Sequence, residues 1–296
     1  MTAPSLGPLG VWGHLDSLDA DGARAYARRA DELGFGALWV PETVGREPFA
    51  LLGMLAGETR SIVLGTSVVS IWGHDAQTTR MAALTLAEAS DGRFVLGVGV
   101  SHPHLAVRLR GHQFERPLTR TREFLAAYRA ATVRGAALAG VTEPPVLVAA
   151  LRERMTDLAA TDADGAFPYL VTAERVAWMR ARLDAATSSS PTLAVTLPVA
   201  LVDDPGDRDA ARAYLRPYLR TPTYHASWAL QGFTADDWEA PGSDRLMDAM
   251  VAIGDAEQAR ARIGELHAAG ADHVAIIPLA PDGSTEHLPT LEALAP

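Results

Sequence analysis

Short apolar runs alternate with helical patterns from one end of this chain to the other. This order is typical of βαβ units with a parallel sheet. The runs are apolar along their whole length, as expected of strands covered on both faces, which argues against an antiparallel sandwich. Eight runs predict an α/β fold, a closed (β/α)8 TIM barrel: Leu9–Gly13, Ala37–Pro41, Ile62–Val69, Phe94–Val100, Val146–Ala150, Asp164–Phe167, Thr192–Leu201 and His273–Leu279.

Helical spacing is clearest in two segments. Asp21–Leu33 carries apolar residues on one face, with Asp19 or Asp21 as a cap and Gly34 as a stop. Asp255–Ala269 has the same pattern and is also followed by glycine and an apolar run. We interpret the two segments as corresponding βα units.

Two long connections interrupt the regular alternation, Ser101–Pro145 after the fourth strand and Asp203–Asp272 after the seventh. Each is expected to contain helices of its own. The second carries four prolines and two tryptophans, which predicts a folded lid. Barrels of about 250 residues or more form one unit, so residues 1–296 are expected to be a single domain.

Composition excludes several functions. Cys is absent, which removes disulfides and thiolate chemistry, and Lys is absent, which removes Schiff-base catalysis. The net charge of −10 argues against nucleic acid or an anionic membrane as a partner. No apolar run approaches the roughly 20 residues of a membrane span, and the N-terminus lacks a secretory signal pattern. We therefore expect a cytoplasmic protein.

Polar residues at strand ends are the first candidates for chemistry, because barrel enzymes react where strands end. His14 follows the first strand and Glu42 the second. Partial burial would raise the pKa of Glu42 and suit it to proton transfer. The alternative is a structural carboxylate paired with Arg46.

His102 follows the fourth strand, where an imidazole can transfer protons near neutral pH. His102 and His104 are also spaced to bind a metal. Further ligands at strand ends are scarce, so we do not expect a metal.

Glycines and aromatic residues also mark this end of the barrel. Gly97 and Gly99 either leave room for a ring or phosphate or allow tight packing inside the barrel. Trp12 and Trp72 are candidates for a cavity wall, whereas Trp39 is expected to pack in the core. Four arginines cluster after the fourth strand, and one of them can hold an anionic tail: Arg108, Arg110, Arg116 and Arg120.

Four runs of sequence resemble the luciferase-like flavin and deazaflavin oxidoreductases, and within them the coenzyme F420-dependent branch. The runs are LGFGALWVPETVGREPF, IVLGTSVVSIWGHDAQTTRMAALTLAEASDGRFVLGVGVSH, ADGAFPYLVTAERV and GDAEQARARIGELHAAGADHVAIIPL. The resemblance implies a (β/α)8 barrel with the cofactor ring over the strand ends. It also implies a bulge in the third strand, often with a non-prolyl cis peptide, here Ser67–Val68.

The resemblance implies roles for particular residues. Glu42 and Ser70 would lie near the cofactor ring, and the loop after the fifth strand would lead its phosphate to a helix N-terminus. Glu42, His102 and His14 are the catalytic candidates. The cofactor-binding candidates are Trp12, Glu42, Ser67, Val68, Ser70, Gly99, Val100, Ser101, His102, Ala149, Ala150, Leu151 and Arg152.

Two positions depart from the family pattern. Glu42-Thr43 stands where many deazaflavin enzymes have Asp-His, so the usual acid or base is either replaced by His102 or His14 or is missing. Arg152-Glu153 stands where a Gly-Pro step is expected. Arg152 either grips the phosphate directly or marks a degraded phosphate site.

The expected function is hydride transfer between F420 and a small organic substrate. The alternatives are an FMN-dependent monooxygenase of the luciferase type, a barrel without cofactor that acts as a binding protein, and a metal-dependent hydrolase. Relatives commonly form homodimers through their second and third helices, here Pro48–Gly57 and Thr78–Ser90.

Overall fold

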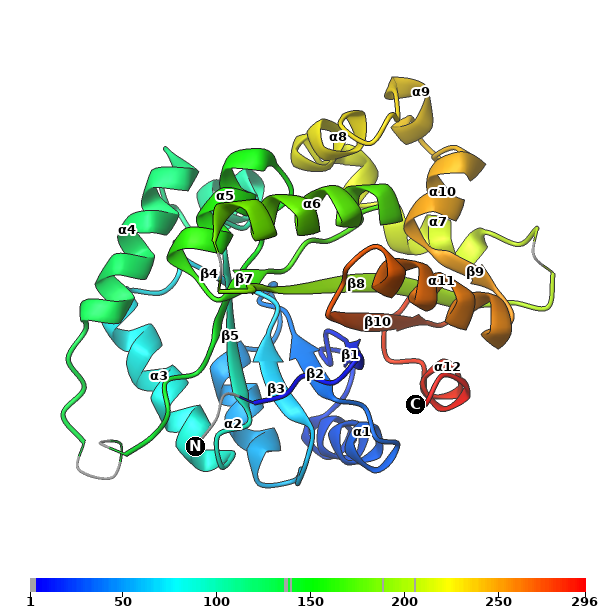
Figure 1. The fold of residues 1–296 in the computed structure, drawn as a ribbon. Helices are drawn as coiled ribbons and strands as arrows, with labels where there is room; N and C mark the ends of the chain where they lie inside the picture. Colours follow the sequence, from blue (N-terminus) through cyan, green and yellow to red (C-terminus); the bar gives the residue numbers. More distant parts are fainter. Residues whose placement is uncertain (1–3, 136–137, 139, 188, 205) are drawn as a thin grey trace.

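Eight parallel strands close into a barrel in the computed structural model, which describes residues 4–135, 138, 140–187, 189–204 and 206–296 (Figure 1). β10 pairs with both β1 and β8 and thereby closes the sheet. The prediction of a (β/α)8 barrel is confirmed. The barrel strands, in their order around the sheet, are β1 (Leu9–Trp12), β2 (Ala37–Val40), β3 (Val63–Thr66), β5 (Phe94–Gly99), β6 (Val146–Val148), β7 (Gly165–Ala166), β8 (Thr192–Leu201) and β10 (His273–Leu279).

The third and seventh strands depart from the simple barrel pattern. The predicted run Ile62–Val69 is divided into β3 and a short β4 (Val69–Ser70), separated by a cis peptide bond between Ser67 and Val68. β4 then pairs with β5. β8 extends beyond the barrel and pairs there with an additional strand, β9 (Ala252–Gly254), which we did not predict.

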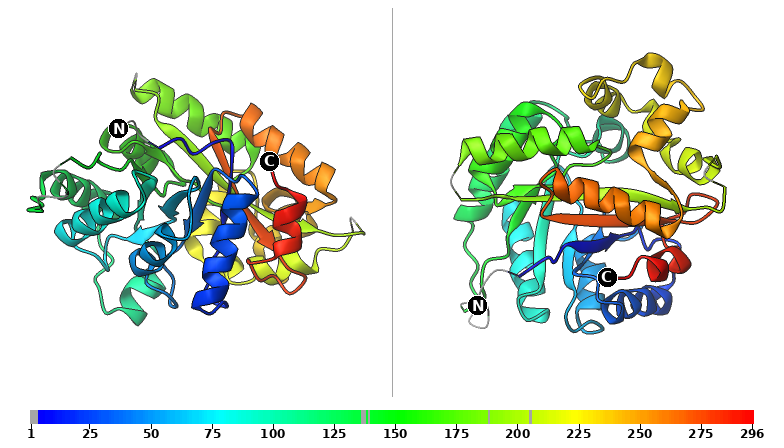
Figure 2. Two further views of the ribbon diagram at one scale, coloured as in Figure 1. Left: turned by 90° about the horizontal axis from the view of Figure 1, so that it is seen from below. Right: turned by 45° about the vertical axis from the view of Figure 1, so that its right-hand side comes forward.

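Helices surround the barrel, as the two views of Figure 2 show. α1 is capped by Asp19, one of the two expected caps, and α11 by a reciprocal pair of hydrogen bonds between Asp255 and Gln258, so both predicted helices form. The helices outside the two insertions are α1 (Ala20–Glu32), α2 (Pro48–Ala56), α3 (Ala76–Ala89), α5 (Glu153–Asp162), α6 (Ala173–Ala186) and α12 (Leu288–Ala293), and α11 (Ala256–Ala268) lies at the end of the second insertion.

Both insertions contain helices, as predicted. The first carries a π-helix, η1 (His104–Leu109), and α4 (Pro117–Ala130). The second carries α7 (Asp209–Leu215), the 3-10 helix η3 (Tyr218–Arg220), α8 (Pro222–Ala229), α9 (Ala235–Trp238) and α10 (Asp244–Met250). We call residues 209–250 the lid segment; its helices α8 and α9 project from one side of the barrel (Figure 1).

Large side chains fill the N-terminal end of the barrel. Trp39 is fully buried, and its indole N–H donates to His273 Nε2 at 2.9 Å. His273 Nδ1 in turn donates to the Gly7 carbonyl at 2.8 Å. Trp39 also packs on Phe167, with ring centroids 4.6 Å apart. This confirms the predicted core role of Trp39 and leaves the opposite, C-terminal end for a site.

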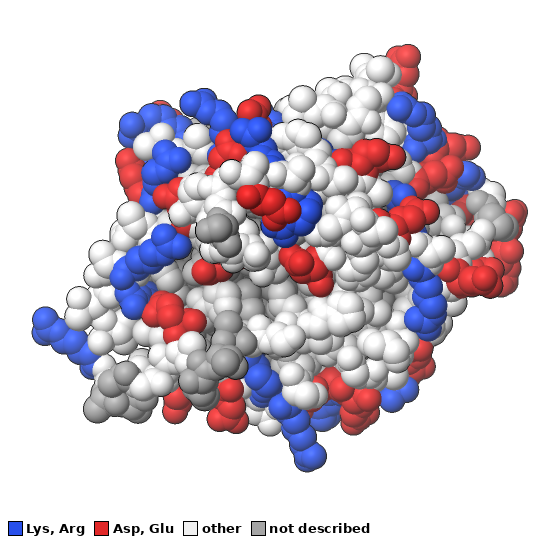
Figure 3. All heavy atoms as spheres, in the orientation of Figure 1, with Lys and Arg blue, Asp and Glu red and all other residues white. Residues whose placement is uncertain are grey.

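Arginine and acidic side chains are mixed over the face drawn in Figure 3, and no continuous basic patch covers that face. Within the described residues, no helix is both long and apolar enough to cross a membrane.

Candidate active site

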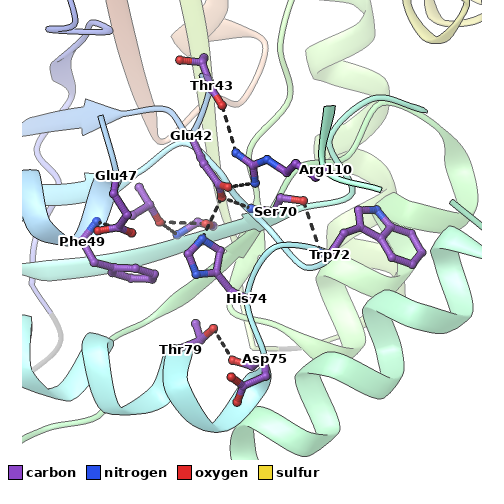
Figure 4. A network of polar contacts seen from close by, with 12 residues as sticks. Glu42, Thr43, Glu47, Phe49, Ser70, Trp72, His74, Asp75, Thr79 and Arg110 are labelled. Carbon is purple, nitrogen blue, oxygen red and sulfur yellow. Dashed lines mark hydrogen bonds and ion pairs between the residues drawn. The ribbon is translucent and has the colours of Figure 1, made fainter. Parts of the chain in front are cut away.

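Glu42 lies at the centre of a polar network at the C-terminal end of the barrel (Figure 4). Its carboxylate forms an ion pair with Arg110 and accepts hydrogen bonds from the Ser70 backbone N–H at 2.6 Å and from His74 Nε2 at 3.1 Å. The Glu42 side chain is only 6% exposed. Arg110 also donates to the Thr43 carbonyl at 3.0 Å. The network therefore connects the loops that follow β2, β4 and β5.

The pKa of Glu42 is lowered, not raised as we expected. Burial alone would raise it, but the hydrogen bonds from His74, Ser70 and Arg110 together outweigh burial. The hydrogen bond to Glu42 in turn raises the pKa of His74, although burial opposes this shift. Glu42 is consequently a carboxylate anchored in the protein, and it is poorly suited to accept a proton.

The alternative interpretation of Glu42 as a structural carboxylate paired it with Arg46, and this pairing is wrong. Arg46 instead donates to the carbonyls of Leu15 and Leu18. Arg110 belongs to the arginine cluster that the sequence placed after the fourth strand, and it follows η1 directly. Only the fold brings Arg110 to Glu42, because the two residues are 68 positions apart.

Trp12 and the bulge after β3 meet at the barrel mouth. The Trp12 indole N–H lies 3.1 Å from Ser67 Oγ and 3.3 Å from the Ser67 carbonyl. Ser67 and Val68 are half-buried, and Ser70 is buried. The cis peptide at Ser67–Val68 is the one that the family resemblance implies.

The two glycines of β5 are explained by packing. A Cβ on Gly97 would lie 2.1 Å from the Thr66 carbonyl oxygen, and one on Gly99 would lie 2.6 Å from a Val68 methyl group and 3.0 Å from Ala149 Cβ. The structure thus favours the tight-packing interpretation over room for a phosphate. Val100 and Ser101 continue from β5 and are half-buried.

His102 lies between η1 and the lid segment. Its ring stacks on His104 with centroids 5.7 Å apart and lies 5.4 Å from the ring of Tyr224. Burial lowers the pKa of His102 to about 4, with a smaller contribution from His104. His102 Nδ1 is buried and has no hydrogen-bond partner within the described residues. This imidazole is therefore neutral at pH 7 and has a free ring nitrogen.

His14 packs edge-on against Trp12, with ring centroids 4.8 Å apart. Burial lowers the pKa of His14, although Glu286 and Asp16 act in the opposite direction. The structure thus places His14 beside Trp12, a neighbour of the bulge, and gives it no hydrogen bond to His102 or Glu42 among the described contacts.

Four tyrosines gather between the barrel mouth and the lid segment, and we call them the tyrosine cluster: Tyr169, Tyr214, Tyr218 and Tyr224. The Tyr169 ring is also parallel to that of Trp12, with centroids 6.4 Å apart. Tyr169 lies after β7, and the other three belong to the lid segment. Sequence reasoning missed this cluster, although the spacing of three tyrosines along 214–224 was a visible signal.

Arg175, which sequence reasoning also missed, is the buried arginine near the predicted phosphate loop. Arg152 is exposed at the N-cap of α5 and makes no side-chain capping bond. Arg175 is 8% exposed and donates to the Leu151 carbonyl at 2.7 Å. Its Nε has no hydrogen-bond partner in the described part of the chain. Ala149 and Leu151 are half-buried in this loop, and Ala150 is buried.

Two pockets lie away from the mouth. One of about 510 Å³ lies at the N-terminal ends of β6, β7, β8 and β10. Another of about 420 Å³ lies outside the barrel between Trp72 and α4. Trp72 faces that outer pocket, and its indole N–H donates to the Val100 carbonyl at 2.7 Å. The reactive groups of barrel enzymes gather at the C-terminal ends of the strands, so neither pocket is our candidate site.

The described residues contain no group of three or more His, Asp or Glu side chains arranged to hold a metal ion. The stacked rings of His102 and His104 add no third ligand.

A parallel barrel with polar and aromatic side chains gathered at its strand ends is typical of barrel enzymes. The family model described as "Luciferase-like monooxygenase" matches residues 5–273, so the chain belongs to that family.

One relative and two solved structures illustrate the family. The chain is 25% identical to "Putative coenzyme F420-dependent oxidoreductase Rv3520c" of Mycobacterium tuberculosis, over 97% of each chain. It resembles the coenzyme F420-dependent tetrahydromethanopterin reductase of Methanopyrus kandleri with a TM-score of 0.74 and 15% identity, over 98% of this chain and 97% of that one.

The second solved structure binds a different cofactor. It is the oxygenating constituent of 3,6-diketocamphane monooxygenase from Pseudomonas putida in complex with FMN. The TM-score is 0.72 at 16% identity, over 98% of this chain and 96% of that one. At such identities the two structures establish the fold alone; one is described as dependent on coenzyme F420, and the other holds FMN.

Proposed function

We propose that this protein is a coenzyme F420-dependent oxidoreductase that transfers a hydride between the deazaflavin C5 and a small organic substrate. The observation that carries the proposal is the neutral imidazole of His102, whose buried Nδ1 lacks a partner at the barrel mouth. A full-length relative named for F420 supports this choice of cofactor over FMN.

The residues near α5 fit the anionic tail of such a cofactor. Arg175 is a buried cation with no ion pair within 4 Å among the described residues, and its Nε lacks a partner. It contacts Leu151, just before the first turn of α5, where backbone N–H groups favour anions. We therefore assign Arg175, together with the first turn of α5, to the tail, in place of Arg152.

The residues at the barrel mouth have different roles in the proposed reaction. When bound, the deazaflavin supplies the two-electron chemistry. His102 accepts the hydroxyl proton when an alcohol is oxidised, because its lowered pKa keeps the imidazole unprotonated at neutral pH. Trp12 holds Ser67 of the bulge, and Glu42 holds Ser70 in the adjoining strand β4. The lid segment covers His102 and excludes water.

Titration of the purified protein with F420 and with FMN, followed by fluorescence quenching, tests this proposal. We expect F420 to bind at least tenfold more tightly than FMN. Arg175→Met should weaken F420 binding at least tenfold, because it removes a buried charge of opposite sign to the tail. Arg154→Met, a change at an exposed arginine two residues beyond Arg152, is the matched control and should bind normally.

The outcomes separate the alternatives. Tighter binding of FMN would favour a luciferase-type monooxygenase, which the FMN-bound Pseudomonas structure makes the second candidate. Binding of neither cofactor would contradict both enzyme hypotheses and favour a barrel that acts as a binding protein. Equal affinities of the Arg175→Met and Arg154→Met variants would contradict the assignment of the tail.

A further inference from the structure

The tyrosine cluster is a group of aromatic rings in mutual contact, formed by the loop after β7 and the lid segment. Tyr218 lies at its centre, with ring centroids 5.3 Å from Tyr169, 5.7 Å from Tyr214 and 5.2 Å from Tyr224. The hydroxyl groups of Tyr169 and Tyr214 hydrogen-bond to each other, which joins the loop after β7 to the lid segment. The Tyr224 ring contacts His102, so the cluster borders the proposed proton acceptor.

The groups of this surface are uncharged at neutral pH. Burial is the main cause that raises the pKa of Tyr169, Tyr214 and Tyr224, and the other contributions come from tyrosines of the same cluster. No arginine or carboxylate is among the main causes of these shifts. Burial likewise keeps His102 neutral.

The charged side chains of the Glu42 network are already engaged with one another, and Arg175 is assigned to the cofactor tail. Glu42 is paired with Arg110 and bonded to His74, and all three lie around the loop after β4. A carboxylate or ammonium group of a substrate beneath the lid segment would leave water without gaining a partner of opposite charge. Such burial of an unpaired ion is strongly unfavourable.

Within the described residues, a hydrogen-bonding group beside the tyrosine cluster lacks a partner. His102 Nδ1 is buried, and an unpaired buried nitrogen costs free energy unless a ligand or water satisfies it. A hydroxyl or carbonyl oxygen is a suitable partner for a neutral imidazole. The mouth thus combines aromatic rings with a site for a polar oxygen at His102.

From this arrangement we propose that the substrate class is uncharged: a small alcohol or carbonyl compound with an apolar body, whose oxygen binds His102 and whose body packs on the tyrosine cluster. This assignment rests on the proposed function and specifies the substrate of the same site. It also makes Tyr218, the central ring, a residue that determines specificity.

Three probes of one shape and different charge test the proposal: benzyl alcohol, benzoate and benzylammonium. Their dissociation constants are measured by ligand-observed NMR, with F420 present and again without it. We expect benzyl alcohol to bind at least tenfold more tightly than either ion under both conditions. Equal or tighter binding of benzoate or benzylammonium would overturn the proposal, as would a failure of benzyl alcohol to bind.

A charge placed in the cluster gives a second, independent measurement. Tyr218→Arg should reverse the order of benzyl alcohol and benzoate, because it introduces the missing cation beside the ring. Tyr26→Phe, in α1, removes another buried hydroxyl and should leave the order unchanged. Unchanged preference in a folded Tyr218→Arg protein contradicts the role of Tyr218. If that variant does not fold, the wild-type preference among the three probes still decides the proposal.

The test distinguishes this inference from the proposed function. A protein that binds benzyl alcohol selectively but binds no F420 would keep the substrate class and lose the proposed cofactor. A protein that binds F420 but prefers an ion would keep the cofactor and lose the substrate class.

Discussion

Glu42 shows how one residue can have a different role from the one its position suggests. Its place after an apolar strand is typical of a catalytic carboxylate, and burial alone would raise its pKa. Arg110, His74 and the Ser70 N–H provide three partners that reverse this shift. A carboxylate held on both oxygens acts as a brace between loops, so we assign Glu42 a positioning role.

Replacing Glu42 by Gln should destabilise the protein. Arg110 would lose its ion partner in a mostly buried setting, which we expect to cost about 2 kcal/mol of unfolding free energy, somewhat less than for a fully buried pair. The pKa of His74, now raised by Glu42, should fall in the variant. Urea unfolding measures the first effect, and NMR titration of the imidazole measures the second.

Glu32→Gln is the matched control for Glu42→Gln. Glu32 is 66% exposed and lies 3.8 Å from Arg29, so its loss should cost less than about 0.5 kcal/mol. If both variants unfold at the same urea concentration, or if the pKa of His74 does not change, the brace role of Glu42 is wrong.

Sequence reasoning identified single residues best where a strand end alone sets their position. The sequence placed Trp12, Glu42 and His102 at or just after strand ends, and the structure has all three there. Arg110 and Arg175 could not be assigned from the sequence, because their partners, Glu42 and Leu151, lie 68 and 24 positions earlier in the chain. The predicted direction of the Glu42 pKa shift was wrong for a similar reason. The burial of Glu42 follows from its place after a strand, whereas the three donors that bond to Glu42 come from distant segments.

At the scale of elements, the close contact between β3, β5 and the bulge depends on glycine residues, which carry no side chain. Gly97 accepts a hydrogen bond from Thr66 Oγ1 with its carbonyl and donates its own N–H to the same oxygen, both at 2.8 Å. The strands are therefore closer here than a side chain would allow. A Cβ at this position would meet backbone, which cannot move aside as a flexible side chain can.

Gly97→Ala should consequently destabilise the barrel by about 3 kcal/mol or more, as expected for overpacking against fixed atoms. Gly264→Ala, within α11, is the matched control, since a Cβ there meets nothing within 4 Å. It should stabilise the protein by up to about 1 kcal/mol through helix propensity. Thermal unfolding of both variants checks the prediction. Similar melting temperatures would show that β5 has room for a side chain.

Elements whose ends carry local signals were predicted closely. Thr192–Leu201 and His273–Leu279 agree with β8 and β10 at both ends, and the expected Asp19 cap marks the start of α1. The division of the third strand entered only through family resemblance, because no local pattern marks it. The lid segment was expected as a folded unit, but its short helices depend on contacts that the sequence does not display.

At the scale of the whole molecule, the closed barrel followed from the alternation of apolar runs and helices, since that pattern reflects the covering of both sheet faces. The individual residues of the sequence did not reveal which distant strands pair with each other. The core at the N-terminal end is an example: Trp39 and His273 come from β2 and β10 and meet by a hydrogen bond across 234 residues.

His273 makes the stability of the whole protein depend on pH. Burial lowers its pKa to about 4 from 6.5, so the unfolded chain binds the proton more readily than the folded protein. The resulting loss of stability is absent well above pH 6.5, grows as the pH falls and is complete below about 4. Between pH 7 and pH 5 we expect His273 to account for a loss of about 2 kcal/mol.

His273→Asn isolates this contribution, because Asn retains a donor and an acceptor but does not titrate. Urea unfolding of both proteins at pH 7 and pH 5 should show that the wild type loses about 2 kcal/mol more than the variant over this interval. The other titrating groups, including His102, are the same in both proteins, so their contributions to the pH dependence cancel in the comparison. An equal loss in both proteins would mean that the imidazole at this position is not held neutral.

The pairing of β10 also has a consequence for how the protein is made. β1 and β8 each use β10 as a neighbour, and β10 is the last of the barrel strands in chain order. A ribosome releases the chain from its N-terminus, so both strands keep an open edge until β10 has been synthesised. Open strand edges pair readily with other chains. We therefore expect chains that lack β10 to need chaperones during synthesis, and chains that include β10 to need them far less.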